Sequence, residues 1–198
     1  MDTLRIGVIG LQGDVEEHIS SLVSAFSTLG IAGETKWVRR PIDMEGVDGL
    51  VLPGGESTTI SKLLVKFDLR DRVIEMAGEG APILGTCAGC VLLASQGDEL
   101  VEKTKTRLLG LMEMAVNRNA FGPQRESFEM SVEIPGVGSY PGVFIRAPLI
   151  VNTWGGCRPL ASVEDRIVLA RQDNLLAASF HPELTGDVRF HGMFLDMF

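Results

Sequence analysis

The chain has 198 residues, of which 45% are hydrophobic and 22% charged, as is ordinary for one globular domain with a full core. Lys and Arg number 18 against 26 Asp and Glu, and the net charge of −8 argues against a nucleic-acid-binding body or a polybasic membrane contact. Three cysteines are too few for a disulfide framework, no apolar run approaches the ~20 residues of a membrane span, and no signal-peptide pattern is present, so we expect a cytoplasmic protein.

The first half of the chain alternates short apolar runs with helical patterns. Strands are predicted by the runs at residues 4–9, 37–38, 49–52 and 82–84. A helix is expected between Asp14, as an N-cap with Glu17 in a capping box, and a stop at Gly30. Two more are expected, from Ser57 or Thr58 to about Ala77 and from residue 88 through Ala94. This alternation predicts a parallel sheet with helices on both faces.

The second half has a different pattern. Residues 109–180 form short segments rich in Val and Ile and divided by Gly and Pro, which indicates mostly strands, some of them antiparallel. Residues 188–198 have the pattern of a closing helix. We therefore expect an α/β protein with one domain over residues 1–198. Its three layers would contain a central, mostly parallel sheet, with antiparallel strands in the second half.

A candidate nucleophile stands in the string Gly-Thr-Cys-Ala-Gly at residues 85–89. This G-x-C-x-G pattern is that of a nucleophile elbow with Cys87 in the place of the usual serine. The sharp turn needs Gly85 and Gly89 because side chains there would clash, and it sets the sulfur at a helix N-terminus, where a thiolate is stabilised. The backbone N–H of Ala88 would face a developing oxyanion. The plain alternative is a small buried cysteine at a tight turn.

A thiolate nucleophile needs a base, and the chain has three histidines, His18, His181 and His191. His18 and His191 fall in predicted helices and are expected to be ordinary surface or packed residues. His181 follows an apolar run and precedes Pro182, which disfavours helical geometry at His181. In an extended segment Glu183 would lie on the same face as His181 and could orient the imidazole.

A third element is Pro-Gly-Gly-Glu-Ser-Thr at residues 53–58, again between a predicted strand and a helix. Its glycines let the backbone approach a ligand, and Gly55 could supply a second oxyanion donor. Ser57 or Thr58 could cap the helix that follows. Because ligands collect at the carboxyl ends of parallel strands, this loop and the cysteine loop are expected to lie together.

Cys87 and Cys90 also form a C-x-x-C pair, which is the main rival interpretation of the cysteine motif. Oxidation could join the two sulfurs and switch an enzyme off, although a small core thiol at position 90 is the simpler explanation. No second pair of cysteines accompanies them, so a structural zinc site is not expected.

Taken together, these strings resemble the class I, triad-type glutamine amidotransferases, and within them the glutaminase subunits of pyridoxal 5′-phosphate synthase. The resemblance spans nearly the whole chain, at residues 11–13 with 17–18, 53–58, 85–89, 118–122, 126–129, 144–148 and 180–185. The elbow and His-Pro-Glu are shared by the wider superfamily. Phe-Ile-Arg-Ala-Pro at 144–148 and the N-terminal Leu-Gln-Gly are specific to this branch. The chain departs from the branch at Cys90, usually apolar, and at Pro123, where a basic residue is common.

The resemblance implies hydrolysis of glutamine to glutamate and ammonia, by a subunit that needs no metal or cofactor. Cys87 would attack the side-chain amide, His181 would carry the proton, Glu183 would orient His181, and the N–H groups of Gly55 and Ala88 would hold the oxyanion. The glutamine contacts carried over from the family are Gly55, Glu56, Ser57, Arg118, Ile145 and Arg146, with Arg118 or Arg146 on the α-carboxylate. The ammonia would pass to a separate synthase subunit that builds pyridoxal 5′-phosphate from a pentose phosphate and a triose phosphate, with Gln12, Glu17 and His18 at the interface.

Four other functions remain open from the sequence. The glutaminase could serve a different acceptor. The chain could be a cysteine peptidase or deglycase of a related α/β fold. It could also be a non-catalytic interaction subunit or a redox C-x-x-C protein.

Overall fold

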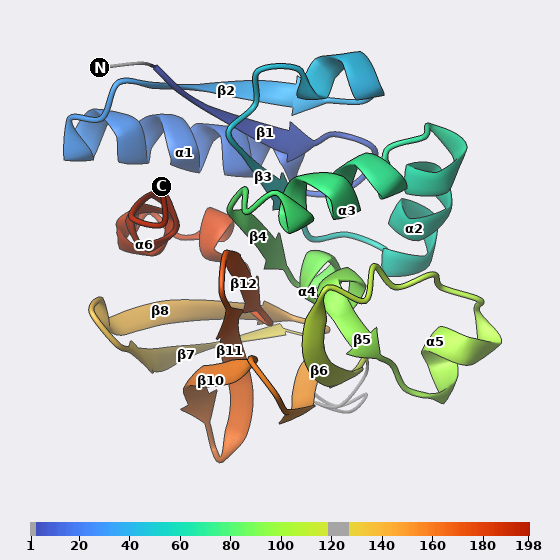
Figure 1. Ribbon diagram of the computed structural model, residues 1–198. Helices are drawn as coiled ribbons and strands as arrows, with labels where there is room; N and C mark the ends of the chain where they lie inside the picture. The colour runs from blue at the N-terminus through green and yellow to red at the C-terminus, as the bar shows by residue number, and fades with distance from the viewer. Residues whose placement is uncertain (1–2, 119–126) are drawn as a thin grey trace.

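A computed structural model describes residues 3–118 and 127–198 (Figure 1). The strands are β1 (Leu4–Ile9), β2 (Gly33–Val38), β3 (Gly49–Leu52), β4 (Ile83–Thr86), β5 (Ala94–Gln96), β6 (Met112–Asn117), β7 (Ser127–Ile134), β8 (Gly138–Ile145), β9 (Leu149–Thr153), β10 (Arg158–Val163), β11 (Arg166–Gln172) and β12 (Leu175–Ala178). The helices are α1 (Val15–Leu29), α2 (Ser57–Lys66), α3 (Arg70–Gly78), α4 (Ala88–Leu93), α5 (Glu99–Lys103) and α6 (Arg189–Leu195), with short 3₁₀ turns η1 (Pro41–Met44) and η2 (Pro182–Leu184). None of the helices in the described chain is long and apolar enough to cross a membrane.

A large sheet with the strand order β2-β1-β3-β4-β12-β11-β9-β6-β5 runs through the molecule. The strands from β2 to β12 pair in parallel, whereas β11 pairs antiparallel with β12, β10 and β9, and β6 pairs antiparallel with β9. A second, two-stranded sheet is formed by β7 and β8. The predicted parallel core and the antiparallel second half are both confirmed.

Two hydrophobic cores lie on opposite faces of the large sheet. Along β3, Val51 packs on the face that α1 and α6 cover, whereas Leu50 and Leu52 pack on the face of α2, α3 and α4. Figure 1 shows the sheet between these two groups of helices. Because β3 is buried on both faces, its sequence is continuously apolar, as a central parallel strand requires.

The single helix expected from residue 57 to about 77 is wrong, because the chain forms α2 and α3 with a break between them. Asp68 adopts φ +57°, a left-handed conformation that Asp tolerates better than most residues. The Leu69 N–H then donates to the Leu64 carbonyl and the Asp68 N–H to the Val65 carbonyl, which is a Schellman ending for α2. Burial of Leu69 stabilises this ending, whereas periodicity alone continues through it.

The carboxyl ends of four parallel neighbours, β1, β3, β4 and β12, meet at one edge of the sheet. The segments that follow these strands contain Gln12 and Asp14, Gly55 and Glu56, Cys87, and His181. The sheet topology thus brings the predicted site residues together from distant parts of the chain.

Candidate active site

Cys87 lies in the turn between β4 and α4, with φ +46° and ψ −101°. Such a backbone is strained for a residue with a side chain, and strained residues are found at functional sites. The turn is tight enough that a Cβ on Gly89 would lie 2.1 Å from the Leu52 carbonyl oxygen, and one on Gly85 would lie 2.7 Å from the Gly89 backbone. The close packing of α4 against β3 and β4 is therefore the reason that residues without side chains are needed on both sides of Cys87.

His181 and Glu183 form a close, buried pair. Nδ1 of His181 lies 2.7 Å from Oε1 of Glu183, and the Glu183 side chain is fully buried. The predicted extended geometry is wrong, because Pro182 begins the 3₁₀ turn η2, yet this turn also brings the two side chains together. Burial raises the pKa of Glu183, and the contact with His181 opposes that rise.

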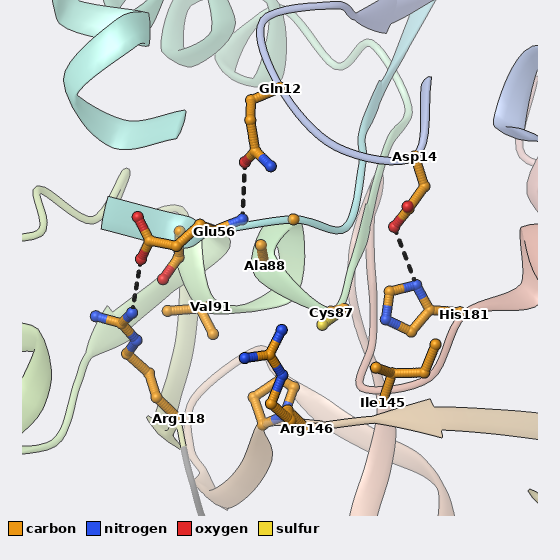
Figure 2. Close-up of a pocket in the computed structure, with 13 residues that line it drawn as sticks. Gln12, Asp14, Glu56, Cys87, Ala88, Val91, Arg118, Ile145, Arg146 and His181 are labelled. Atoms are coloured by element: carbon orange, nitrogen blue, oxygen red, sulfur yellow. Dashed lines mark hydrogen bonds and ion pairs between the residues drawn. The ribbon is translucent and has the colours of Figure 1, made fainter. Parts of the chain in front are cut away.

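Asp14 provides a second carboxylate to the same imidazole. Its Oδ2 lies 3.4 Å from Nδ1 of His181 (Figure 2). Asp14 occupies the N-cap position of α1, as predicted, but its side chain makes no cap hydrogen bond. Burial lowers the pKa of His181, but the neighbouring Asp14, Cys87 and Glu183 outweigh it and raise the pKa to about 12. His181 therefore favours the imidazolium form beside the thiol.

The backbone at Gly54 lies close to the His181 imidazole because Gly54 has no side chain. A Cβ at position 54 would lie 2.5 Å from Cε1 of His181 and 2.7 Å from Oδ2 of Asp14. The Gly54 carbonyl also accepts a hydrogen bond from the Asp14 N–H at 3.3 Å. A residue without a side chain is needed at position 54 to keep the His181–Asp14 contact.

Cys87 and His181 open onto a cavity of about 360 Å³, which is within the range of small-molecule sites. The side chains around the cavity include Gln12, Arg118 and Arg146 (Figure 2). All six residues predicted to contact glutamine line it: Gly55, Glu56, Ser57, Arg118, Ile145 and Arg146. Ala88, the second predicted oxyanion donor, also lines it, and its N–H belongs to the first turn of α4, where helical N–H groups have no intrahelical acceptor.

Glu56 and Arg118 form a fixed polar wall at the end of the cavity away from His181. Nη2 of Arg118 lies 3.0 Å from Oε1 of Glu56, while Nη1 donates to the hydroxyls of Thr58, Thr104 and Thr106 at 3.1, 3.1 and 3.3 Å. Thr104 and Thr106 lie within residues 102–107, a run that contains charged residues of both signs. Such a run is typical of a solvent-exposed loop, so the sequence gives no indication that Thr106 is buried.

Glu56, rather than Ser57 or Thr58, caps α2. Its carboxylate accepts hydrogen bonds from the N–H groups of Thr58 and Thr59 at 3.0 and 2.7 Å. Burial raises the pKa of Glu56, but the hydrogen bonds from Thr59 and Thr58 lower it to about 2. A stable negative charge therefore faces the cavity beside Arg118.

The three residues predicted at a partner interface lie in different environments. Gln12 faces the cavity, where its Oε1 accepts a hydrogen bond from the Glu56 N–H at 2.8 Å, and Glu17 is exposed on α1. His18 is fully buried, so its placement at an interface is wrong in this conformation. It lies on the inner face of α1, because that face packs against the sheet. The partner contacts of Gln12 and Glu17 stay predictions.

Cys90 belongs to α4, and its side chain is fully buried in the core. Burial raises its pKa strongly, and the neighbouring Cys87 adds to the rise, so the thiol of Cys90 stays protonated and unreactive. This environment favours the packing role over the redox one.

Among the residues that the structure describes, Asp14, His181 and Glu183 form a group whose ligand atoms lie within 4.8 Å of one another. The 2.7 Å contact between Nδ1 and Oε1 is a direct hydrogen bond, and a metal ion bound to both atoms at about 2 Å would push them apart. We therefore assign these residues to proton chemistry. Residues 119–122 and Glu126 of the family-like strings, and Pro123, lie outside the described residues.

A strained cysteine at a strand–helix turn, next to an imidazole paired with a buried carboxylate, defines an enzyme of the thiol-nucleophile class. Comparison with known proteins specifies the family: the chain belongs to the SNO glutamine amidotransferase family, whose model matches residues 8–198.

Its relatives are similar over nearly their full lengths. The chain is 49% identical over 194 residues to a protein of Archaeoglobus fulgidus named pyridoxal 5′-phosphate synthase subunit PdxT, with 98% of each covered. A protein of the same name from Methanocella arvoryzae is 50% identical over 195 residues, covering 98% of this chain and 97% of the relative. A solved structure described as a glutamine amidotransferase superposes with a TM-score of 0.86 at 45% identity, covering 97% of both chains. A second, described as PurLQS from Thermotoga maritima, shares the fold at 12% identity, with a TM-score of 0.68 and 99% of both chains covered.

Proposed function

We propose that this chain hydrolyses L-glutamine to L-glutamate and ammonia, and that the ammonia passes to a separate synthase subunit that makes pyridoxal 5′-phosphate. The observation that carries the proposal is Cys87 in its strained turn, opening with His181 onto one cavity, in a chain that belongs to a glutamine amidotransferase family. We assign residues 1–198 to one glutaminase domain, located in the cytoplasm.

The reaction follows from the protonation of His181. At rest the proton of the Cys87 thiol would sit on His181, giving a thiolate and an imidazolium that Glu183 and Asp14 stabilise. The thiolate attacks Cδ of glutamine, and the carbonyl π electrons move onto oxygen. The resulting oxyanion is held by the N–H groups of Gly55 and Ala88.

Collapse of this intermediate breaks the C–N bond, while His181 gives its proton to the departing nitrogen and ammonia leaves. A thioester remains between Cys87 and the glutamyl group. His181, now neutral, takes a proton from water as the water attacks the thioester carbon. Glutamate then leaves, and the thiolate and the imidazolium are restored.

The other end of the substrate would meet the charged groups across the cavity. Arg118 is already held by Glu56 and three threonine hydroxyls, whereas the Arg146 side chain has no hydrogen-bond or ion-pair partner among the described residues. We assign Arg146 as the residue that binds the α-carboxylate of glutamine. A guanidinium without another partner can donate two parallel hydrogen bonds to the two carboxylate oxygens. The ionised Glu56 would hold the α-ammonium.

The test is glutamate release from glutamine, measured with and without the synthase subunit, for the wild type and for Cys87→Ala. We expect turnover that increases with the partner and is abolished in Cys87→Ala. Cys157→Ala, which removes a buried thiol outside the cavity, serves as the matched control and should keep the wild-type rate. Absence of turnover in the wild type under both conditions would refute the proposal. Thiol exchange that survives loss of His181 would instead indicate the redox alternative.

A further inference from the structure

The side of Glu183 that faces away from His181 lies against a buried histidine. His18 on α1 is completely buried, and its Nε2 lies 3.3 Å from Oε2 of Glu183 and 2.9 Å from Oγ1 of Thr86. Oε2 is a buried carboxylate oxygen without a hydrogen-bond partner among the described residues, and the Nε2 of His18 lies within ion-pair distance of it. Thr86 directly precedes Cys87, and therefore His18 connects the elbow to the turn that holds Glu183.

The neighbours of His18 determine where its proton lies. Nδ1 of His18 is 3.5 Å from Nε2 of His191, which comes from α6. If His18 carried its proton on Nδ1, the lone pair of Nε2 would face the Glu183 carboxylate, and Nδ1 of His191 would be a buried donor without a partner. If the proton is on Nε2, it points toward Oε2 and Oγ1, and Nδ1 accepts from His191. Only an acceptor, Nδ1 of His191, is then unpartnered, which costs less than an orphaned donor.

The charges around His18 favour a neutral ring. It faces Glu183 from η2, His191 from α6 and, further away, His181. Burial, followed by the repulsion of His191 and His181, lowers the pKa of His18 well below its usual value. A neutral donor can orient the Glu183 carboxylate without cancelling its charge, which remains available to the His181 imidazolium.

We propose that His18 is a positioning residue for the triad: its Nε2–H holds Oε2 of Glu183 and the Thr86 hydroxyl, so that Oε1 stays aimed at Nδ1 of His181. His18 touches neither the cavity nor the substrate, and it acts through Glu183. The inference rests on the proposed glutaminase function for its kinetic consequence, but the proton position and the reactivity of Cys87 can be measured without glutamine.

The first measurement needs no variant. In wild-type protein with ¹⁵N-labelled histidine, the ring nitrogen shifts of His18 should show a neutral ring protonated on Nε2. A ring protonated on Nδ1 would overturn the proposal, whatever any variant does.

The second measurement compares His18→Asn with His18→Gln. The glutamine amide can place an N–H near the position of Nε2, whereas the shorter asparagine amide reaches only the position of Nδ1. With the synthase subunit present, we expect His18→Asn to lower kcat about 10- to 100-fold with KM for glutamine unchanged, since the Nε2–H that we direct at the Glu183 carboxylate is lost. His18→Gln should recover most of the rate. Iodoacetamide alkylation of Cys87 near neutral pH should be slower in His18→Asn, because the imidazolium that accompanies the thiolate is less well held.

Phe26→Leu is the matched control, since it loosens the packing of the same helix about two turns away from His18. It should keep the wild-type kcat and alkylation profile. Equal losses in His18→Asn and Phe26→Leu would reduce His18 to a packing residue and overturn the proposal, as would a wild-type rate in His18→Asn. If His18→Asn does not fold, His18→Leu replaces it in the kinetic and alkylation measurements. If neither variant folds, the tautomer of His18 in the wild-type protein alone tests the proposal. A wild type without turnover refutes the glutaminase proposal alone, because the tautomer and alkylation still test His18.

Discussion

Asp14→Asn should lower the pKa of His181 by about one unit. Asp14 is a second carboxylate at the His181 imidazole, with 3.4 Å between Oδ2 and Nδ1. The asparagine is nearly isosteric and can still accept a hydrogen bond, so the substitution removes mainly the charge. The α1 cap is not affected, because the Asp14 side chain makes no cap hydrogen bond.

The size of the effect follows from the distance and the exposure. Two unit charges 3.4 Å apart attract by about 1 kcal/mol in bulk water and by about 5 kcal/mol at an effective dielectric constant of 20. The Asp14 side chain is 34% exposed, so water screens the pair and a value of about 1–2 kcal/mol is appropriate, which is about one pKa unit.

The sign follows from the direction of the His181 shift. Asp14 raises the pKa of His181, so its loss lowers that pKa and destabilises the imidazolium. The His181 ring should therefore lose its proton at lower pH. The assay is a pH titration of the His181 ring nitrogens in protein with ¹⁵N-labelled histidine, with Glu16→Gln as the control, because it removes the same charge from an exposed position on α1. A His181 midpoint in Asp14→Asn within the error of the wild-type value would refute the reasoning.

Three further changes test the rest of the site. Glu183→Gln should lower kcat about 10³- to 10⁴-fold, since the amide can present a donor to Nδ1 and impose the wrong tautomer on His181; steady-state kinetics would contradict this with a loss below tenfold. Arg146→Ala should raise KM for glutamine about 10- to 100-fold with little change in kcat, as expected for a lost hydrogen bond to a charged group. Equal effects on kcat and KM would instead indicate a role in the reaction. Gly54→Ala, whose added Cβ lies 2.5 Å from Cε1 of His181, should shift the imidazole and cost about 10²-fold in kcat, and a wild-type rate with unchanged thermal stability would show that the loop yields.

The parts of the site that the sequence predicts are those specified by neighbours in the chain. The elbow needs only a strand, two small residues around Cys87 and a helix, and all of them lie within one short segment. The pairing of His181 with Glu183 is also local, which is why it survives the error about backbone geometry: an extended segment and a 3₁₀ turn both bring the two side chains together.

The misjudged residues are those whose partners are remote in sequence. Asp14 stands where a capping residue is expected, yet its carboxylate faces His181, 167 positions further along the chain. The resemblance places His18 at a partner interface, but the sheet and α6 cover it. Local composition contains no information about either contact, because both arise from segments that follow β1 and β12, two parallel strands that end at the same edge of the sheet.

The two carboxylates at Nδ1 of His181 also differ in a way that divides their roles. Glu183 is fully buried and 2.7 Å away, so its charge acts in a low dielectric and its position is fixed by the surrounding protein. The contact of Asp14 with Nδ1 is longer by 0.7 Å (3.4 against 2.7 Å). Asp14 also lines the cavity and is partly exposed, so water and substrate can reach it. Loss of Glu183 should therefore change the tautomer and abolish most catalysis, whereas loss of Asp14 should shift only the pH at which His181 loses its proton. A pH titration of the His181 ring separates these two roles in a way that a single rate at one pH cannot.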